Sequence, residues 1–359
     1  MFFEDLDMNN NTFIPADTNE FQYMGRIDFL DEKAPLFIYA GSLVKTRFTG
    51  TKVSIVIKNL NAYYDNYIGY IIDGNTEGKV KVNKHNEKIV LELADELKDG
   101  VHELTIFKRQ DGCHYFNFYG LVLDKGCKVL NPEPRPKRRI ECYGDSISAG
   151  EISEAVDYVG KKDPEKQNGE YSNSWYSYSM ITARNLKAEL NNNAQGGLAV
   201  MDGTGYFMEE GYVGLESTYD KLKYNPQLGK ITKWDFKRYT PHVVIMALGQ
   251  NDDHPDNYIN RDMEKRQLWK EKYKDIIKSL RYKYPKALFV IITTLLNHDK
   301  GWDDALDEIQ RELEDKKVVR CKFKRNGCAT PGHLRIPEAY EMATELTEFI
   351  ESFGEDVWK

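Results

Sequence analysis

The feature that most constrains the fold is a change of pattern on either side of "NPEPRPKRR", residues 131–139. Its three alternating prolines favour extended backbone and withhold the N–H groups that helices and sheets need. A chain of 359 residues is also long for a single hydrophobic core. We therefore expect one domain at residues 1–130, a linker at 131–139, and a second domain at 140–359.

The region before this linker has the pattern of an antiparallel β sandwich. The stretch "KVSIVIK" places Val53, Ile55 and Ile57 on one face, and "HELTIF" places Leu104 and Ile106 likewise. A period of two is typical of half-buried strands. Turn-forming residues in "DGN", "KDG" and "QDG" separate these stretches, as in a sandwich.

After the linker, short apolar strands alternate with helical patterns. The expected strands are 140–143, 243–248, 288–293 and 318–323, and the expected helices are near 174–190, 264–284, 302–314 and 337–352. Such alternation is typical of a parallel sheet covered by helices on both faces. Ligands bind such sheets where loops follow the carboxyl ends of the strands, so residues at these positions are the first candidates for chemistry.

Charge and composition narrow the range of partners. The formal net charge of -7 argues against a nucleic-acid partner, because such binding depends on Lys and Arg. The basic run at 135–139 is interpreted as a solvated linker. No stretch approaches the roughly 18 apolar residues of a membrane span, and no signal peptide is visible. Five cysteines without a CxxC pair favour a reduced, cytoplasmic protein. No obligate protein partner is predicted.

Polar residues follow two of the expected strands, and a glycine pair lies between them. Ser146 in "ECYGDSISAGE" can either cap a helix or act as a nucleophile. Asn251 in "VVIMALGQND" can form a turn or donate to an oxyanion. Gly196 and Gly197 in "NNNAQGGLAV" would let a backbone N–H approach a substrate closely.

A serine nucleophile needs a base within hydrogen-bond reach near neutral pH. Of the seven histidines, His254, His298 and His333 follow strands or open a helix on the predicted crevice side. The residues by themselves leave all three as candidates.

The motifs "GDS", a later glycine, "GQND" and a histidine before the last helix, in that order, resemble the four blocks of the SGNH hydrolases, a branch of the GDSL esterases. The resemblance implies a three-layer α/β/α domain. It implies Ser146 as nucleophile and His333 as base. The implied oxyanion donors are the Ser146 N–H, Gly196 or Gly197, and Asn251.

The chain also resembles carbohydrate esterase family two, in which a β jelly roll precedes an SGNH domain. The resemblance lies in "GRIDF", "AGSLVKTRFTGTKVSIVI", "DGVHELTIFKR" and "WDFKRYTPHVVIMALGQND", and it spans nearly all of the chain. One departure is Gln250, where the family usually has threonine. The family removes O-acetyl groups from xylans, mannans and related plant sugars, so the expected substrate is an acetylated oligosaccharide. With HExxH and paired-cysteine motifs absent, we expect neither metal nor other cofactor.

A second departure concerns the acid of the catalytic triad. SGNH enzymes commonly carry an aspartate three residues before the histidine, and here that position is Thr330. We therefore predict a Ser-His dyad, with a backbone carbonyl accepting the Nδ1 proton of His333. A distant acid, such as Asp303 or Asp304, remains the alternative.

Trp302 in "NHDKGWDD" is the candidate for an exposed aromatic surface that binds sugar, with Asp303 as a second candidate contact. Two alternative functions remain: a lipid or thioester hydrolase of the GDSL type, and a catalytically weak carbohydrate-binding protein. The preferred polysaccharide, the acetyl position and the oligomeric state are left open.

Overall fold

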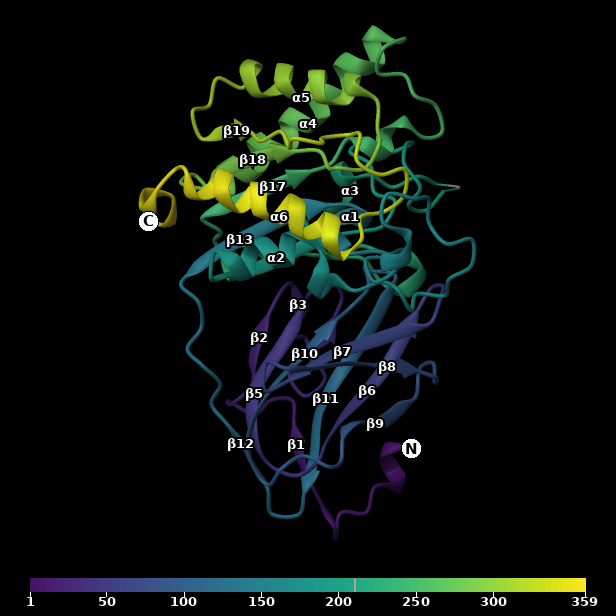
Figure 1. The fold of residues 1–359 in the computed structure, drawn as a ribbon, viewed down its shortest axis with the longest axis vertical. Coiled ribbons are helices and arrows are strands. Elements are labelled where there is room, and N and C mark those ends of the chain that lie inside the picture. The colour runs from purple at the N-terminus through teal and green to yellow at the C-terminus, as the bar shows by residue number, and fades with distance from the viewer. Residues whose placement is uncertain (210) are drawn as a thin grey trace.

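The computed structural model describes residues 1–209 and 211–359, which form two domains stacked end to end (Figure 1). The first domain is a sandwich of two antiparallel sheets. One sheet contains β1 (Asn11–Pro15), β3 (Ile27–Asp28), β4 (Leu36–Phe37), β6 (Val53–Asn61), β9 (Lys88–Ala94) and β11 (His114–Asp124). The other contains β2 (Gln22–Met24), β5 (Leu43–Gly50), β7 (Asn66–Ile72), β8 (Thr76–Val82), β10 (Gly100–Lys108) and β12 (Val129–Leu130).

The sandwich core consists of the residues that the period-two pattern indicated. Val53, Ile55 and Ile57 of β6 are fully buried. They pack in one cluster with Leu104 and Ile106 of β10, from the facing sheet. The prediction of an antiparallel sandwich is confirmed. The segment 131–137 that follows β12 forms no helix or strand.

The second domain is built on a five-stranded parallel sheet with the order β14–β13–β17–β18–β19. Its strands are β13 (Arg138–Gly144), β14 (Ala188–Ala194), β17 (Val243–Ala247), β18 (Leu288–Ile292) and β19 (Val318–Arg320). The helices are α1 (Ser146–Ala149), α2 (Tyr178–Asn185), α3 (Leu215–Thr218), α4 (Met263–Lys283), α5 (Lys300–Glu312) and α6 (Ile336–Glu351). A small separate sheet pairs β15 (Lys221–Lys223) with β16 (Thr232–Lys233). Short 3-10 helices span Phe3–Asp5, Val156–Tyr158, Ser174–Tyr176, Pro226–Leu228, Phe236–Arg238, Gln250–Asp253 and Glu355–Trp358.

Helices cover both faces of this parallel sheet, with α4 and α5 on one side and α2 and α6 on the other (Figure 1). Along β17, Val244 and Met246 pack with residues of α4 and α5. Val243, Ile245 and Ala247 pack with residues of α2 and α6. A strand that is buried on both faces is apolar at every position, which is why the sequence pattern of β17 is continuous. The expected three-layer α/β/α arrangement is confirmed.

One expected element is wrong. The helix predicted near 174–190 ends at Asn185, and β14 begins at Ala188. Three consecutive asparagines, Asn191–Asn193, interrupt the apolar pattern of this strand, although all are buried. The Asn192 amide donates to the carbonyl of Ser148 at 2.8 Å. A buried strand whose polar side chains find partners elsewhere in the fold has no apolar signature in the sequence.

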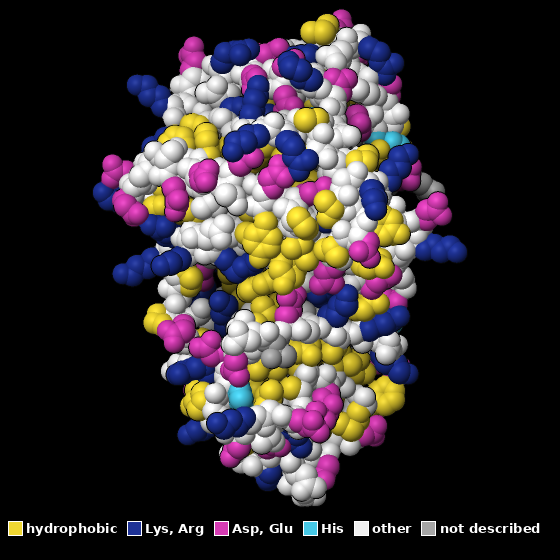
Figure 2. All heavy atoms as spheres, in the orientation of Figure 1, with side chains coloured by type: hydrophobic (Ala, Val, Ile, Leu, Met, Phe, Trp, Pro, Cys, Tyr) yellow, Lys and Arg dark blue, Asp and Glu magenta, His cyan; other side chains and the backbone are white. Residues whose placement is uncertain are grey.

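A buried arginine joins the two domains. Arg26 of the sandwich is completely buried, and its guanidinium donates to the Glu141 carboxylate at 3.2 Å and to the Tyr143 hydroxyl at 2.5 Å. Both partners belong to β13. On the face shown in Figure 2, acidic and basic side chains are interspersed over both domains. In the part of the chain that the structure describes, we find no helix with the length and apolar character of a membrane span.

Candidate active site

A cleft of about 490 Å³ lies where the loops after β13, β14 and β17 meet the loop before α6 and a turn of the sandwich. All five residues predicted for the chemical step line it: Ser146, Gly196, Gly197, Asn251 and His333. Segments that are far apart in the sequence therefore converge at the carboxyl end of the parallel sheet, as expected for this architecture.

Ser146 is the first residue of α1, and the helix cap is its neighbour. The Asp145 carboxylate accepts the Ile147 N–H at 3.0 Å, as an N-cap side chain does. The Ser146 hydroxyl has no hydrogen-bond partner among residues 1–209 and 211–359, and the residue is 6% exposed. The capping function that the sequence left open for Ser146 thus belongs to Asp145.

The two glycines after β14 differ in what their N–H groups do. The Gly196 N–H donates to the Asp111 carboxylate at 3.0 Å. The Gly197 N–H, like that of Ser146, has no acceptor within the described part of the chain. The Asn251 amide nitrogen donates to the Leu198 carbonyl at 3.1 Å and makes a longer contact of 3.4 Å with Oδ2 of Asp145. Gly197 is therefore the glycine with a free donor at the cleft.

His333 has an acidic partner that the sequence analysis missed. Its Nδ1 lies 2.6 Å from Oδ2 of Asp163, a residue 170 positions earlier in the chain. The other oxygen of Asp163 accepts the backbone N–H of His333 at 2.9 Å and the Arg335 guanidinium at 2.8 Å. The expectation that a backbone carbonyl accepts the Nδ1 proton is wrong, because this carboxylate occupies that position.

Asp163 lies in the long connection between α1 and α2, which contains only short 3-10 helices. No motif marks it. The only signal in the sequence was the length of this connection, because long loops without regular structure are often functional.

Carboxylates set the charge of His333. Burial by itself lowers the pKa of an imidazole, but Asp163, Glu151 and Asp145 outweigh this and raise the pKa of His333 above its usual value. The Glu151 carboxylate lies 3.9 Å from Nε2 of His333. Burial also raises the pKa of Asp145 to about 6. Despite its partial burial, the pKa of Asp163 falls well below its usual range because His333 and Arg335 stabilise the anion.

The alternative acids are not near His333. Asp303 is buried in a separate network, where it accepts from Thr293 at 2.7 Å and lies 3.1 Å from Nε2 of His298. Asp304 pairs with Lys300 at the surface. His298 thus belongs to this network and not to the cleft.

The expectation that Trp302 is an exposed sugar-binding residue is wrong. Its side chain is 0% exposed and packs edge to face against Tyr258 and Trp269, with ring centroids 5.3 and 5.2 Å away. The residue lies on the inner face of α5, because the apolar face of that helix must cover the sheet. Asp303 points into the buried network described above and not toward the cleft.

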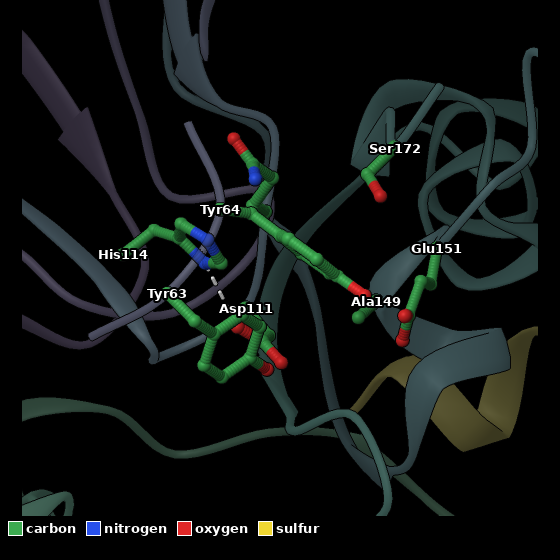
Figure 3. A pocket seen from close by; sticks show the side chains of 8 residues that line it. Tyr63, Tyr64, Asp111, His114, Ala149, Glu151 and Ser172 are labelled. Carbon is green, nitrogen blue, oxygen red and sulfur yellow. Dashed lines mark hydrogen bonds and ion pairs between the residues drawn. The ribbon is translucent and has the colours of Figure 1, made fainter. Parts of the chain in front are cut away.

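Three tyrosines provide the aromatic lining instead. Tyr63 and Tyr64 come from the sandwich and are 44% and 41% exposed, and Tyr206 of the second domain is 51% exposed. The Tyr206 ring stacks on His254 with centroids 4.0 Å apart. A small side cavity adjoins the cleft between Tyr63 and Tyr64 of one domain and Glu151 of the other (Figure 3). Both domains therefore build the site.

The carboxylates of the cleft do not gather into a metal site. Within residues 1–209 and 211–359, no group of three or more His, Cys, Asp and Glu side chains is arranged to hold a metal ion.

Comparison with known proteins agrees with this architecture. The family described as "Carbohydrate esterase 2 N-terminal" matches residues 23–133. The cellulase/esterase CelE of Acetivibrio thermocellus is 30% identical over 88% of this chain, which spans only 34% of that relative. The acetylxylan esterase / glucomannan deacetylase of Cellvibrio japonicus is 25% identical over 95% of this chain and 90% of its own length.

A solved structure shows the same two-domain fold. A family two carbohydrate esterase from Clostridium thermocellum, in complex with cellohexaose, superposes with a TM-score of 0.77 at 27% identity. The match covers 93% of this chain and 98% of that one. The matched family, the relatives and this structure together show that the chain resembles the carbohydrate esterases of family two over both of its domains.

Proposed function

We propose that this protein is a serine esterase that removes acetyl groups from plant-derived oligosaccharides. One observation carries the proposal: Ser146, Gly197, Asn251 and His333 line one cleft, and the Nδ1 of His333 lies on the Asp163 carboxylate. A nucleophile, a base oriented by a third group, and free amide donors are the parts that acyl transfer requires.

The chemistry of each residue follows from its contacts. Asp163 holds the proton on Nδ1 of His333, which leaves the Nε2 lone pair free to accept the hydroxyl proton of Ser146. The Ser146 oxygen attacks the acetyl carbonyl, and the oxyanion is stabilised by the N–H groups of Ser146 and Gly197 and by the Asn251 amide. His333 then protonates the departing sugar oxygen. Water hydrolyses the acetyl-enzyme with His333 as base, which releases acetate. Ser146, His333 and Asp163 thus form a catalytic triad in place of the Ser-His dyad expected from the sequence.

The cleft lining supports a carbohydrate over a fatty acyl chain. Its aliphatic side chains are Leu296 and Pro331, whereas carboxylates, amides and the three tyrosines make up much of the remainder. A long acyl chain would need a continuous apolar wall to bury its methylenes. Tyrosine rings offer flat apolar faces together with a polar hydroxyl, which suits the faces and rims of sugar rings.

The relatives support the class of substrate. The Clostridium thermocellum structure holds cellohexaose, and the Cellvibrio japonicus relative is named for acetylxylan and glucomannan. We therefore propose acetylated mannan or xylan fragments as substrates of this chain.

We also propose that the enzyme works in the cytoplasm on imported fragments. All five cysteines are free thiols, which supports a reducing compartment.

Acetate release from acetylated glucomannan and xylan oligosaccharides, followed by NMR, tests the proposal and identifies the ring position that is deacetylated. We expect Ser146→Ala to lower kcat at least about a thousandfold, because the nucleophile is lost. Ser217→Ala is the matched control, since its hydroxyl bonds Asp202 at the surface. Turnover that survives in Ser146→Ala would overturn the esterase assignment.

A further inference from the structure

We propose that the β-sandwich domain takes part in catalysis through Asp111, a positioning residue that fixes the orientation of the oxyanion donor Gly197. The inference rests on the proposed esterase function and assigns the first domain a part in the chemical step. It differs from a role in binding sugar, because Asp111 acts on the backbone of the other domain.

Asp111 lies in the turn between β10 and β11, and its side chain reaches into the second domain. Its Oδ2 accepts the Gln195 side-chain amide at 2.6 Å and the Gly196 N–H at 3.0 Å. Its Oδ1 accepts the Cys113 N–H at 3.0 Å within the sandwich. One carboxylate therefore ties the loop after β14 to the turn after β10. Figure 3 shows Asp111 beside His114, whose ring nitrogen contacts the same carboxylate.

The same amide of Gln195 also fixes the peptide unit that carries the Gly197 donor. Its nitrogen donates to the Gly196 carbonyl at 3.0 Å. The peptide bond between Gly196 and Gly197 is planar and trans, so its C=O and N–H point in opposite directions. Holding the carbonyl on one side therefore aims the Gly197 N–H toward the other side.

This loop needs an external support. Gly196 and Gly197 are consecutive glycines, and Gly197 has φ of +72°, in the left-handed region. Without side chains, this pair can adopt many backbone conformations. The Tyr224 hydroxyl donates to the Gln195 side-chain oxygen at 2.6 Å, which fixes the orientation of that amide. Asp111 accepts from the nitrogen of the same Gln195 amide, so that the backbone of residues 195–197 is held in one conformation.

The Asp111 carboxylate is buried yet remains an anion. Burial by itself raises its pKa, but His114, Lys108 and the Cys113 N–H outweigh this and lower the pKa below its usual value. Lys108 also donates to the carbonyls of Gln110 and Asp111, which supports the turn. Hydrogen bonds to an ionised acceptor are shorter and stronger than neutral ones. The Asp111 carboxylate therefore holds the Gln195 amide and the Gly196 N–H more strongly than a neutral acceptor would.

Asp111→Leu is the direct test. The new side chain has a similar branched shape but no oxygen to accept from the Gln195 amide and the Gly196 N–H. We expect kcat to fall about 100-fold, since a misplacement of about 1 Å can cost that much, while KM stays within about threefold. A KM effect without a kcat effect would overturn the proposal, because it would indicate sugar binding.

Asp124→Leu is the matched control. Asp124 lies in the same domain and likewise accepts backbone N–H groups, from Thr51 at 2.7 Å and Lys52 at 3.1 Å. It contacts the turn between β5 and β6 and not the cleft. We expect its kcat to stay within twofold of the parent, even if both variants lower the midpoint of thermal unfolding. Equal losses of kcat in the two variants would overturn the proposal.

Gln195→Met is a second variant that tests the same inference if Asp111→Leu does not fold. It removes the amide between Asp111 and the Gly196 carbonyl, so it should also lower kcat at unchanged KM. When both substitutions act through one peptide unit, the double variant should lose much less than the product of the single losses. A folded Gln195→Met protein with parental kcat would overturn the positioning role. Ser146→Ala, measured alongside, reports on the esterase assignment separately.

Discussion

Replacing Asp163 with asparagine should strongly lower kcat, because the proton on His333 should move from Nδ1 to Nε2. Oδ1 of Asp163 accepts two donors, the His333 backbone N–H at 2.9 Å and the Arg335 guanidinium at 2.8 Å. The carbonyl oxygen of the new asparagine should take this side, because its NH2 group would face both donors there. The NH2 group then faces Nδ1, which must become an acceptor. The proton moves to Nε2, the atom that should accept the serine proton.

The size of the effect follows from those two hydrogen bonds. A bond from a charged donor contributes about 1.5–3 kcal/mol and a neutral one about 1 kcal/mol. The inactive tautomer is therefore favoured by about 2–4 kcal/mol, which is about 30- to 1000-fold at 1.36 kcal/mol for each tenfold. Loss of the carboxylate that stabilises the imidazolium adds to this. The corresponding change in a protease triad costs about 10⁴ in kcat. We expect a loss of about 10³–10⁴.

Initial rates with nitrophenyl acetate and with an acetylated oligosaccharide give kcat and KM for this variant. Asp304→Asn is the control, since Asp304 pairs with Lys300 at the surface and should keep the parental rate. A folded Asp163→Asn enzyme with kcat within tenfold of the parent would refute the reasoning. The Ser-His dyad expected from the sequence would then stand.

Three further changes test other parts of the structure. Glu151→Gln removes a carboxylate 3.9 Å from His333, so the pKa of His333 should fall. Because the base must be unprotonated, the acidic limb of the kcat/KM profile should move to lower pH; an unmoved limb would contradict this. Arg26→Met leaves Glu141 without its buried partner, and urea unfolding should show a loss of about 3–5 kcal/mol; a loss below about 1 kcal/mol would disprove the interdomain anchor. Trp302→Ala should cost about 3–5 kcal/mol of unfolding free energy and leave KM unchanged; a raised KM would restore its binding role.

The sequence was most informative where structure depends on neighbouring residues. The alternation in β6 and the continuous apolar run of β17 predicted a half-buried strand and a strand covered on both faces. The exception was β14, where the buried Asn191 and Asn192 donate to Glu141 and to the carbonyl of Ser148, which other segments supply. The local sequence pattern does not reveal these hydrogen-bond partners, because they are distant in the chain.

The residues of the cleft also divide into those that the sequence predicted and those that only the tertiary structure brought together. The order of the motifs, in loops on the carboxyl side of the expected sheet, predicted that Ser146, Asn251 and His333 lie at one end of the sheet. Only the tertiary structure brought Asp163 to His333 across 170 residues, and Asp111 to Gly196 across 85. Only the packing of α5 against the sheet decided that Trp302 is buried. Periodicity and turn chemistry act over a few residues, whereas these contacts depend on how long loops and two domains fold against each other.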